Sequence, residues 1–217
     1  MNFNLTPKEA VQQQRELRER VRIEPLRETP RIVAGSDISY NIGSDVCHAG
    51  FVLFDFASQE VIGRYSITTK MTFPYVPGLL SYREIPALWE VWQTLPERPD
   101  LLFMDGQGIL HPRRLGVACH FGILADVPAI GVGKSVLLGK FDPPAPERGS
   151  ISYMRDGEAI IGAAVRTKNR VKPVYVSPGH RINLEQSIEY VLRFDSGYRI
   201  PKPTRQADLF VNAVRRG

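Results

Sequence analysis

The middle of the chain combines a short apolar run with a glycine-rich turn. Leu101–Met104 has the length of a buried strand and ends abruptly in Asp105. Gly106 and Gly108 then permit a tight turn and the close approach of a bulky group. A carboxylate at the carboxyl end of a buried strand lies where open α/β sheets bind ligands. A turn in which Asp105 merely caps the following helix is the alternative, and the pattern alone leaves it open.

The first seventy residues change from a helical to a β pattern. Thr6 and Pro7, with a glutamate at position 9, are typical of a helix start. The charged stretch 12–22 predicts a solvent-exposed helix, ended by the prolines at 25 and 30. From residue 31 the apolar and polar residues alternate with a period of two. This alternation predicts an antiparallel meander of three strands, Arg31–Tyr40, Ala49–Phe56 and Val61–Thr69.

A stiff loop follows this meander. Pro74 and Pro77 restrict the backbone around Tyr75 and Val76, and Gly78 releases it. Such a loop could present the aromatic ring as a wedge or as a stacking platform for a base. A rigid turn whose tyrosine packs on the body of the protein is the commoner alternative for an isolated motif of this kind.

The next helix, predicted over 81–95, raises a question about Glu84. Ser81 and Glu84 match a capping box, which would make the glutamate structural. In that register, however, Pro86 falls at the fifth helical position, where its missing N–H would remove a hydrogen bond. A helix that begins at Pro86 fits better and leaves Arg83 and Glu84 in the segment before it.

The second half of the chain predicts further strands and two amphipathic helices. A short strand over 128–133 ends in Lys134, but Pro128 replaces the first glycine of a P-loop, which excludes that motif. Four cations alternate at positions 166, 168, 170 and 172, so in an extended chain they would share one face. They indicate either a stripe for backbone phosphates or a charged edge strand. The other expected elements are the hairpin strands Ser150–Arg155 and Glu158–Thr167, the strand Val174–Val176, and the helices Asn183–Phe194 and Pro203–Arg216.

Composition narrows the class of protein. The 217 residues, 43% hydrophobic and 24% charged, suit one soluble globular domain. No apolar stretch approaches the length of a membrane span, and the N-terminus does not resemble a signal peptide, so we expect a cytoplasmic protein without membrane contact. Cys47 and Cys119 are expected to be reduced thiols. The net charge of +5 slightly favours a polyanionic partner.

Four acids interrupt small or apolar surroundings: Asp37, Glu84, Asp105 and, less clearly, Asp208. If the fold brings them together, their repulsion requires a divalent cation between them. Carboxylate and water ligands favour Mg²⁺ or Mn²⁺ over zinc. Placed beside Lys134, His111 and Arg113, such a cation would suit phosphodiester hydrolysis.

Three motifs in this order resemble the endonuclease V family. They are Pro74–Glu84, the Asp105–Gly108 turn with 111–118, and Gly131–Ser135, and the resemblance runs from about Ile32 to Asp208. It implies an α/β, RNase H-like fold with a mixed five-stranded sheet flanked by helices. The whole chain, 1–217, would be a single domain, with 1–30 as N-terminal helix and lead-in and 31–217 as the core with the C-terminal helices.

The resemblance also implies an activity and its residues. Deoxyinosine in double- or single-stranded DNA would be recognised by a monomer, and Mg²⁺-dependent hydrolysis of the second phosphodiester 3′ to the lesion would leave 3′-hydroxyl and 5′-phosphate ends. Metal ligands would be Asp37, Asp105 and Glu84, with Asp208 at a position where the family places an acid or histidine. Lys134 and His111 would act at the scissile phosphate. The remaining assignments are the wedge Pro74, Tyr75, Val76 and Pro77, the lesion pocket Leu80, Gly106, His111 and Gly116, and the phosphate contacts Arg83 and Arg113.

Gln107 departs from the family pattern, because many members carry histidine there. We expect this to tune the activity without abolishing it, since glutamine can also orient a metal-bound water. Two alternatives stay open: an endoribonuclease that cuts inosine-containing RNA, and a module that binds deaminated nucleic acid without cutting it.

Overall fold

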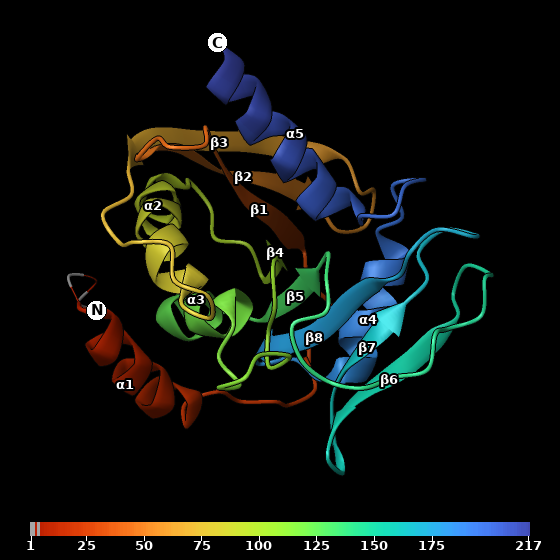
Figure 1. Ribbon diagram of the computed structural model, residues 1–217. Helices are drawn as coiled ribbons and strands as arrows, with labels where there is room; N and C mark the ends of the chain where they lie inside the picture. The colour runs from red at the N-terminus through yellow and green to blue at the C-terminus, as the bar shows by residue number, and fades with distance from the viewer. Residues whose placement is uncertain (1–2, 4) are drawn as a thin grey trace.

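The computed structural model describes residue 3 and residues 5–217, and within this range its sheet has eight strands. The first in the chain, β1 (Ile32–Tyr40), lies third from one edge. The strands of the sheet follow the order β3-β2-β1-β4-β5-β8-β7-β6 (Figure 1). The other seven are β2 (Val46–Asp55), β3 (Val61–Lys70), β4 (Leu101–Asp105), β5 (Ala129–Gly133), β6 (Ile151–Asp156), β7 (Ala159–Val165) and β8 (Val174–His180).

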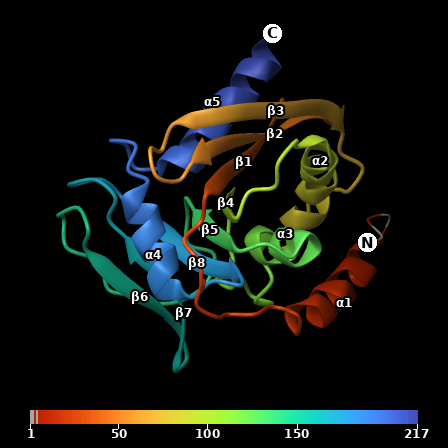
Figure 2. The same ribbon diagram turned by 180° about the vertical axis from the view of Figure 1, so that it is seen from behind.

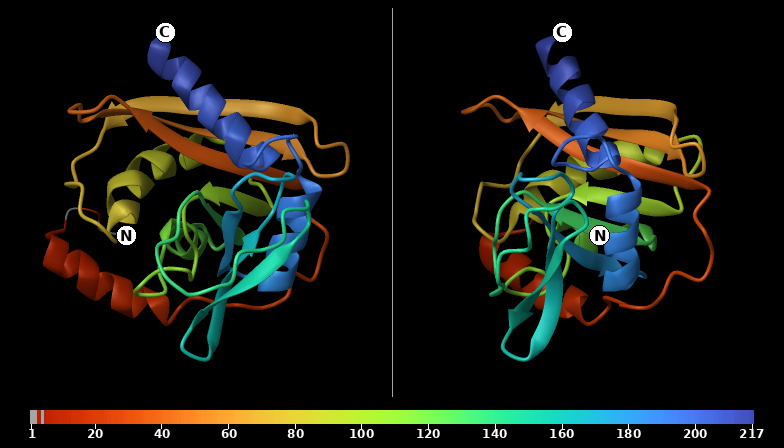
Figure 3. Two further views of the ribbon diagram at one scale, coloured as in Figure 1. Left: turned by 45° about the vertical axis from the view of Figure 1, so that its right-hand side comes forward. Right: turned by 90° about the vertical axis from the view of Figure 1, so that its right-hand side faces the viewer.

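The sheet is mixed, as the family resemblance implied. β1, β2 and β3 form the expected antiparallel meander, with β2 beginning three residues before its predicted start. β1, β4 and β5 are parallel, and β8 pairs antiparallel to β5. The prediction of five strands was too low, because β8 and the β6–β7 hairpin continue the same sheet. Figure 3 shows this hairpin extending away from the body of the molecule.

In the described part of the chain, five helices accompany the sheet: α1 (Pro7–Arg18), α2 (Leu80–Thr94), α3 (Val117–Ala125), α4 (Leu184–Arg193) and α5 (Lys202–Arg216). α2 and α3 cover one face and enclose a core that includes Phe51 and Phe121. α4 and α5 cover the opposite face, around Phe103 and Phe194 (Figures 1 and 2). None of the described helices is both long and apolar enough to cross a bilayer.

The small residues of β1 explain how α5 reaches the sheet. A Cβ on Gly35 would lie 2.0 Å from the carbonyl oxygen of Pro203, just inside the start of α5. Only glycine therefore allows this strand and helix to approach so closely. The contact brings the first half of α5 beside β1, and with it Asp208.

The prediction that α2 begins at Pro86 was wrong. The helix begins at Leu80 and contains Pro86 in its interior. Ser81 does not cap it; its hydroxyl bonds His120 Nδ1 at 3.1 Å, and Tyr82 beside it is fully buried. Tertiary burial of this first turn therefore outweighs the hydrogen bond that the proline removes. Glu84 consequently lies on the helix.

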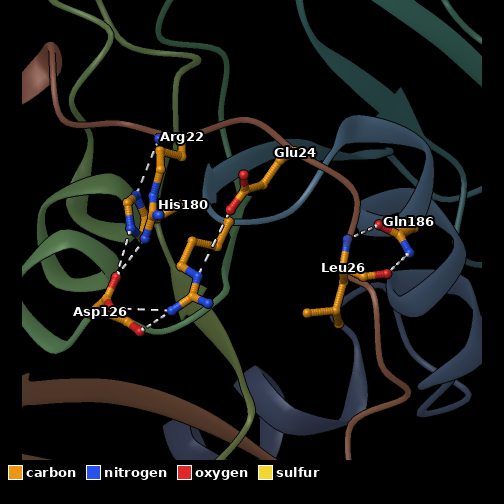
Figure 4. Close-up of polar contacts among 7 residues, drawn as sticks. Arg22, Glu24, Leu26, Asp126, His180 and Gln186 are labelled. Atoms are coloured by element: carbon orange, nitrogen blue, oxygen red, sulfur yellow. Dashed lines mark hydrogen bonds and ion pairs between the residues drawn. The ribbon is translucent and has the colours of Figure 1, made fainter.

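The N-terminal helix is shorter than expected and is not wholly exposed. α1 starts with the predicted capping box, ends at Arg18, and buries one face. The lead-in that follows is tied to the body of the protein, as Figure 4 shows. The backbone N–H of Arg22 donates to His180 Nδ1 at 3.3 Å, and its guanidinium bonds Asp126 at 2.9 Å. Further along, Leu26 and Gln186 exchange two hydrogen bonds of 2.7 and 3.0 Å.

The alternating cations do not form one extended face. β7 ends at Val165, and residues 168–170 make a turn with a positive φ at Arg170. Arg166 is directed inwards and donates to the carbonyl oxygens of Ala145, Pro144 and Val171. The period-two pattern was therefore misleading here, because a turn interrupts it.

Candidate active site

Strand register brings two of the predicted acids together. Ser36 of β1 pairs in parallel with Met104 of β4, so Asp37 and Asp105 follow at the same end of neighbouring strands. Asp105 in turn pairs with Val132 of β5, and Lys134 comes directly after that strand. This is the carboxyl edge of the parallel strands, where the sequence placed a site.

The carboxylates experience burial and mutual repulsion. Burial, followed by the charge of Asp105, raises the pKa of Asp37 well above its usual value. Burial also raises the pKa of Asp105, although Lys134 opposes this shift. Glu84 from α2 joins the cluster, and burial together with the charges of Asp37 and Asp105 raises its pKa to about 8. Such a group of carboxylates favours a positive charge in its midst.

Lys134 provides a positive charge at this edge. Its Nζ donates a hydrogen bond to Asp105 Oδ2 and forms an ion pair with it. Burial lowers the pKa of this lysine, but the charges of Asp105, Asp37 and Asp208 outweigh burial, so the pKa is raised. The ammonium group is thus fixed beside the acids in its charged form.

Asp208 lies nearby but does not line the same cavity. It comes from α5, and its charge contributes to the raised pKa values of Asp37 and Asp105. Its carboxylate accepts a hydrogen bond of 3.2 Å from Asn212, one turn further along the helix. Asp208 therefore acts on the cluster through its charge.

The donor set suits a hard divalent cation. Within residue 3 and residues 5–217, no three His, Cys, Asp or Glu side chains are arranged closely enough to form a complete metal site by themselves. Mg²⁺ is commonly bound through one or two carboxylates, with water and substrate phosphate completing its shell. Asp37, Glu84 and Asp105 line one cavity, so they offer carboxylate oxygens to a cation whose shell is completed by water and phosphate.

A cavity of about 390 Å³ lies over these acids. All four predicted pocket residues line it: Leu80, Gly106, His111 and Gly116. Tyr75, Val76 and Pro77 also line it, whereas Pro74 does not. The side chain of Tyr75 is 67% exposed, so it does not pack on the body of the protein. The site combines acids, a cation, a pocket and a projecting aromatic ring.

Two glycines of the pocket are required by geometry. Gly106 has a φ of +141°, a conformation that other residues rarely adopt. A Cβ on Gly116 would lie 2.1 Å from the carbonyl oxygen of Gln107. These glycines allow the turn after β4 to pack closely against the start of α3.

His111 is a neutral side chain with both ring nitrogens engaged. The backbone N–H of Arg113 donates to its Nδ1 at 3.2 Å, so the ring proton lies on Nε2, which donates to Gly78 O at 3.1 Å. Burial and the neighbouring Arg113 lower its pKa to about 4. In this structure neither nitrogen is available to a phosphate.

The two arginines that were expected to contact phosphates instead hold the ends of the Tyr75 loop, which comprises residues 73–78. Arg83 donates to Phe73 O at 2.6 Å and lies over the ring of Tyr40. Arg113 donates to Gly78 O at 2.7 Å and, through Nε, to Gln14. Sequence reasoning missed Gln14, although a glutamine between Ala10 and Leu17 on the buried face of α1 was a detectable signal.

Gln107 links the turns that follow β4 and β5. Its Nε2 donates to Ser135 O at 3.0 Å, while its buried Oε1 finds no hydrogen-bond partner among the described residues. Gly133 allows this contact, since a Cβ there would lie 2.2 Å from Gln107 Nε2. The glutamine therefore helps to hold together the two turns that carry Asp105 and Lys134.

Comparison with known proteins agrees with this geometry. The family model described as Endonuclease V matches residues 15–209. The chain belongs to the endonuclease V family. An endonuclease V of Myxococcus xanthus is 45% identical over 218 residues, covering 99% of this chain and 92% of the relative. The matched range begins within α1 and ends one residue after Asp208, so it includes every predicted site residue.

Solved structures of endonuclease V share the fold. The Streptomyces avermitilis enzyme superposes with a TM-score of 0.93 at 38% identity, covering 99% of this chain and 95% of that one. The Ciona intestinalis endonuclease V, in complex with a 24mer DNA containing an inosine followed by a ribo-adenosine, has a TM-score of 0.85 at 26% identity, covering 96% and 97%. The predicted RNase H-like fold is confirmed.

Proposed function

We propose that this protein is a Mg²⁺-dependent endonuclease of DNA repair that recognises deoxyinosine. The observation that carries the proposal is that Asp37, Glu84 and Asp105 line one cavity together with Lys134. Tyr75 lines the same cavity. The inosine-containing DNA held by the Ciona intestinalis relative supports the same substrate class. The protein would act as a monomer on double- or single-stranded DNA.

The roles of the residues follow from their surroundings. Asp37, Glu84 and Asp105 would hold the metal ion, and Asp208 would add negative charge from α5. When bound, Mg²⁺, or Mn²⁺ in its place, would activate water and stabilise the charge that develops on the phosphate. Lys134 would neutralise a phosphate oxygen, because its ammonium group is fixed in charged form beside Asp105.

Recognition would use the cavity and the loop together. An inosine base rotated out of the duplex would enter the pocket lined by Leu80, Gly106, His111 and Gly116. The exposed ring of Tyr75 would fill the gap in the base stack. By its family resemblance the enzyme would cut the second phosphodiester bond 3′ to the lesion and leave 3′-hydroxyl and 5′-phosphate ends.

RNA cleavage is a second candidate. The relative from Ciona intestinalis holds a DNA in which a ribo-adenosine follows the inosine, so a ribonucleotide is present beside the lesion in that complex. The 2′-hydroxyl is what lets a protein distinguish RNA from DNA at a given position. Single-turnover cleavage of matched inosine substrates, one DNA and one RNA, separates the two candidates.

Alanine substitutions at Asp37 and Asp105 separate a nuclease from a protein that only binds. Without these carboxylates we expect cutting to fall by roughly a thousandfold or more, because the metal and its water lose their position. Binding of inosine duplex in Ca²⁺ should persist within about threefold, as measured by fluorescence anisotropy.

Asp142→Ala, which removes an exposed carboxylate from the loop after β5, is the matched control and should cut like the wild type. A wild-type protein that binds inosine duplex but cuts in neither Mg²⁺ nor Mn²⁺ would instead be a recognition module.

A further inference from the structure

A buried amide in the N-terminal helix contacts the Tyr75 loop. α1 buries Ala10, Gln14 and Leu17 on one face, and Gln14 is fully inaccessible to solvent. A buried amide is costly unless its polar atoms find partners. Gln14 Nε2 donates to Gly78 O at 3.0 Å and to Leu115 O at 3.4 Å, while its Oε1 accepts from Arg113 Nε. Every polar atom of this side chain is therefore used.

Three side chains from two parts of the chain converge on one carbonyl. Gly78 O accepts from Gln14, from His111 at 3.1 Å and from Arg113 at 2.7 Å. Gly78 has a φ of +79°, and a Cβ there would lie 2.7 Å from Arg113 Nη2. Gly78 ends the proline-clamped loop, so these contacts fix the point at which the loop rejoins the protein.

Gln14 also touches the wall of the pocket. Leu115, whose carbonyl accepts its second hydrogen bond, lines the cavity beside Gly116. The amide thus joins the end of the Tyr75 loop to Leu115, a second residue that lines the cavity. Of the described residues that line the cavity, none belongs to α1, so the helix contacts it indirectly, through residues such as Gly78 and Leu115.

We propose that Gln14 is a positioning residue for recognition of the lesion, an inference that rests on the proposed function. By holding Gly78 O and Leu115 O at once, it sets the distance between the loop that carries Tyr75 and the pocket that receives the base. α1 thereby takes part in discrimination between damaged and undamaged nucleic acid without contacting the base.

Gln14→Glu tests this directly because it keeps the shape of the side chain. The carboxylate still accepts from Arg113, but it can no longer donate to Gly78 O or Leu115 O and places negative charge against both oxygens. Gln12→Glu is the matched control. It makes the same change on the exposed face of α1, where the Gln12 side chain donates to Glu16 at 2.9 Å.

The measurement is the ratio of affinities for an inosine duplex and an undamaged duplex in Ca²⁺. A 2-aminopurine next to the lesion reports unstacking by its fluorescence. We expect Gln14→Glu to lower the ratio about tenfold and to diminish the fluorescence rise, with undamaged duplex bound as before. Gln12→Glu should match the wild type in both readouts.

An unchanged ratio and fluorescence rise in folded Gln14→Glu would overturn the inference. If that variant does not fold, Gln14→Met takes its place, because it removes both donor hydrogens without adding charge. It should lower the affinity ratio and the fluorescence rise in the same way, and unchanged values would overturn the inference. A wild-type protein with no preference for inosine would instead refute the proposed function, so the two failures are distinguishable.

Discussion

Glu84 shows how one residue can be explained differently by sequence and by structure. The sequence offered a capping box with Ser81, but the serine hydroxyl bonds His120 and α2 has no side-chain cap. The glutamate instead lies among the acids of the site, where burial, followed by the charges of Asp37 and Asp105, raises its pKa to about 8. Asp37, Glu84 and Asp105 themselves were predictable as candidates, because they interrupt small or apolar surroundings in the sequence. The partners of Ser81 were not, because His120 lies 39 positions away.

The raised pKa of Glu84 makes a prediction about stability. Between its ordinary value near 4.5 and about 8, the folded protein binds the proton more tightly than the unfolded chain. Metal-free protein should therefore lose stability as pH rises through this window. Glu84→Gln removes the penalty and should raise the free energy of unfolding at pH 8.5 by roughly 2–4 kcal/mol, with no difference from the wild type below pH 4.

Urea unfolding in EDTA at the two pH values checks this, and a Mg²⁺-dependent cleavage assay accompanies it. The variant should have lost its cutting activity. A Glu84→Gln protein that is less stable than the wild type but still cuts would show that the role of Glu84 is structural.

At the scale of elements, the Tyr75 loop was predictable as a loop but not in its anchoring. Its prolines and glycine are visible in the sequence, and the exposed ring agrees with a projecting aromatic. Its ends, however, are held by Arg83 at Phe73 O and by Arg113 at Gly78 O. Long-range bonds of this kind leave no periodic signal in the sequence. The same reason explains why the start of α2 was misplaced: burial of Tyr82 outweighs the local effect of Pro86.

If the loop acts as a wedge, its aromatic ring is needed for binding the lesion. Tyr75→Ala should weaken binding of inosine duplex by about tenfold to a hundredfold, because base–aromatic stacking contributes roughly 1–3 kcal/mol. Tyr75→Phe keeps the ring and should bind within about threefold of the wild type. Equilibrium titration in Ca²⁺ measures the affinities, and single-turnover cleavage at saturating protein measures the cutting rate, which should change less. Equal affinities for the alanine and phenylalanine variants would show that the ring does not stack.

Over the whole molecule, local patterns predicted most elements, and family resemblance predicted their arrangement. The strands β1 to β5 and the helices α4 and α5 lie close to where periodicity placed them. That β8, β7 and β6 extend the same sheet could not be read locally, since strand pairing is a long-range property. The contacts of α1 were missed for a similar reason: its charged pattern indicates exposure, while one face of the helix, which includes the amide of Gln14, is buried.

Nicking of a duplex with a single deoxyinosine tests the central claim most directly. The inosine strand is labelled at its 5′ end and incubated with Mg²⁺ or with EDTA. We expect one product, only with Mg²⁺, which retains the inosine and one further nucleotide and ends in a 3′-hydroxyl. An intact strand in Mg²⁺ and in Mn²⁺, or equal cutting of a duplex without inosine, would contradict the assignment of an inosine-directed endonuclease.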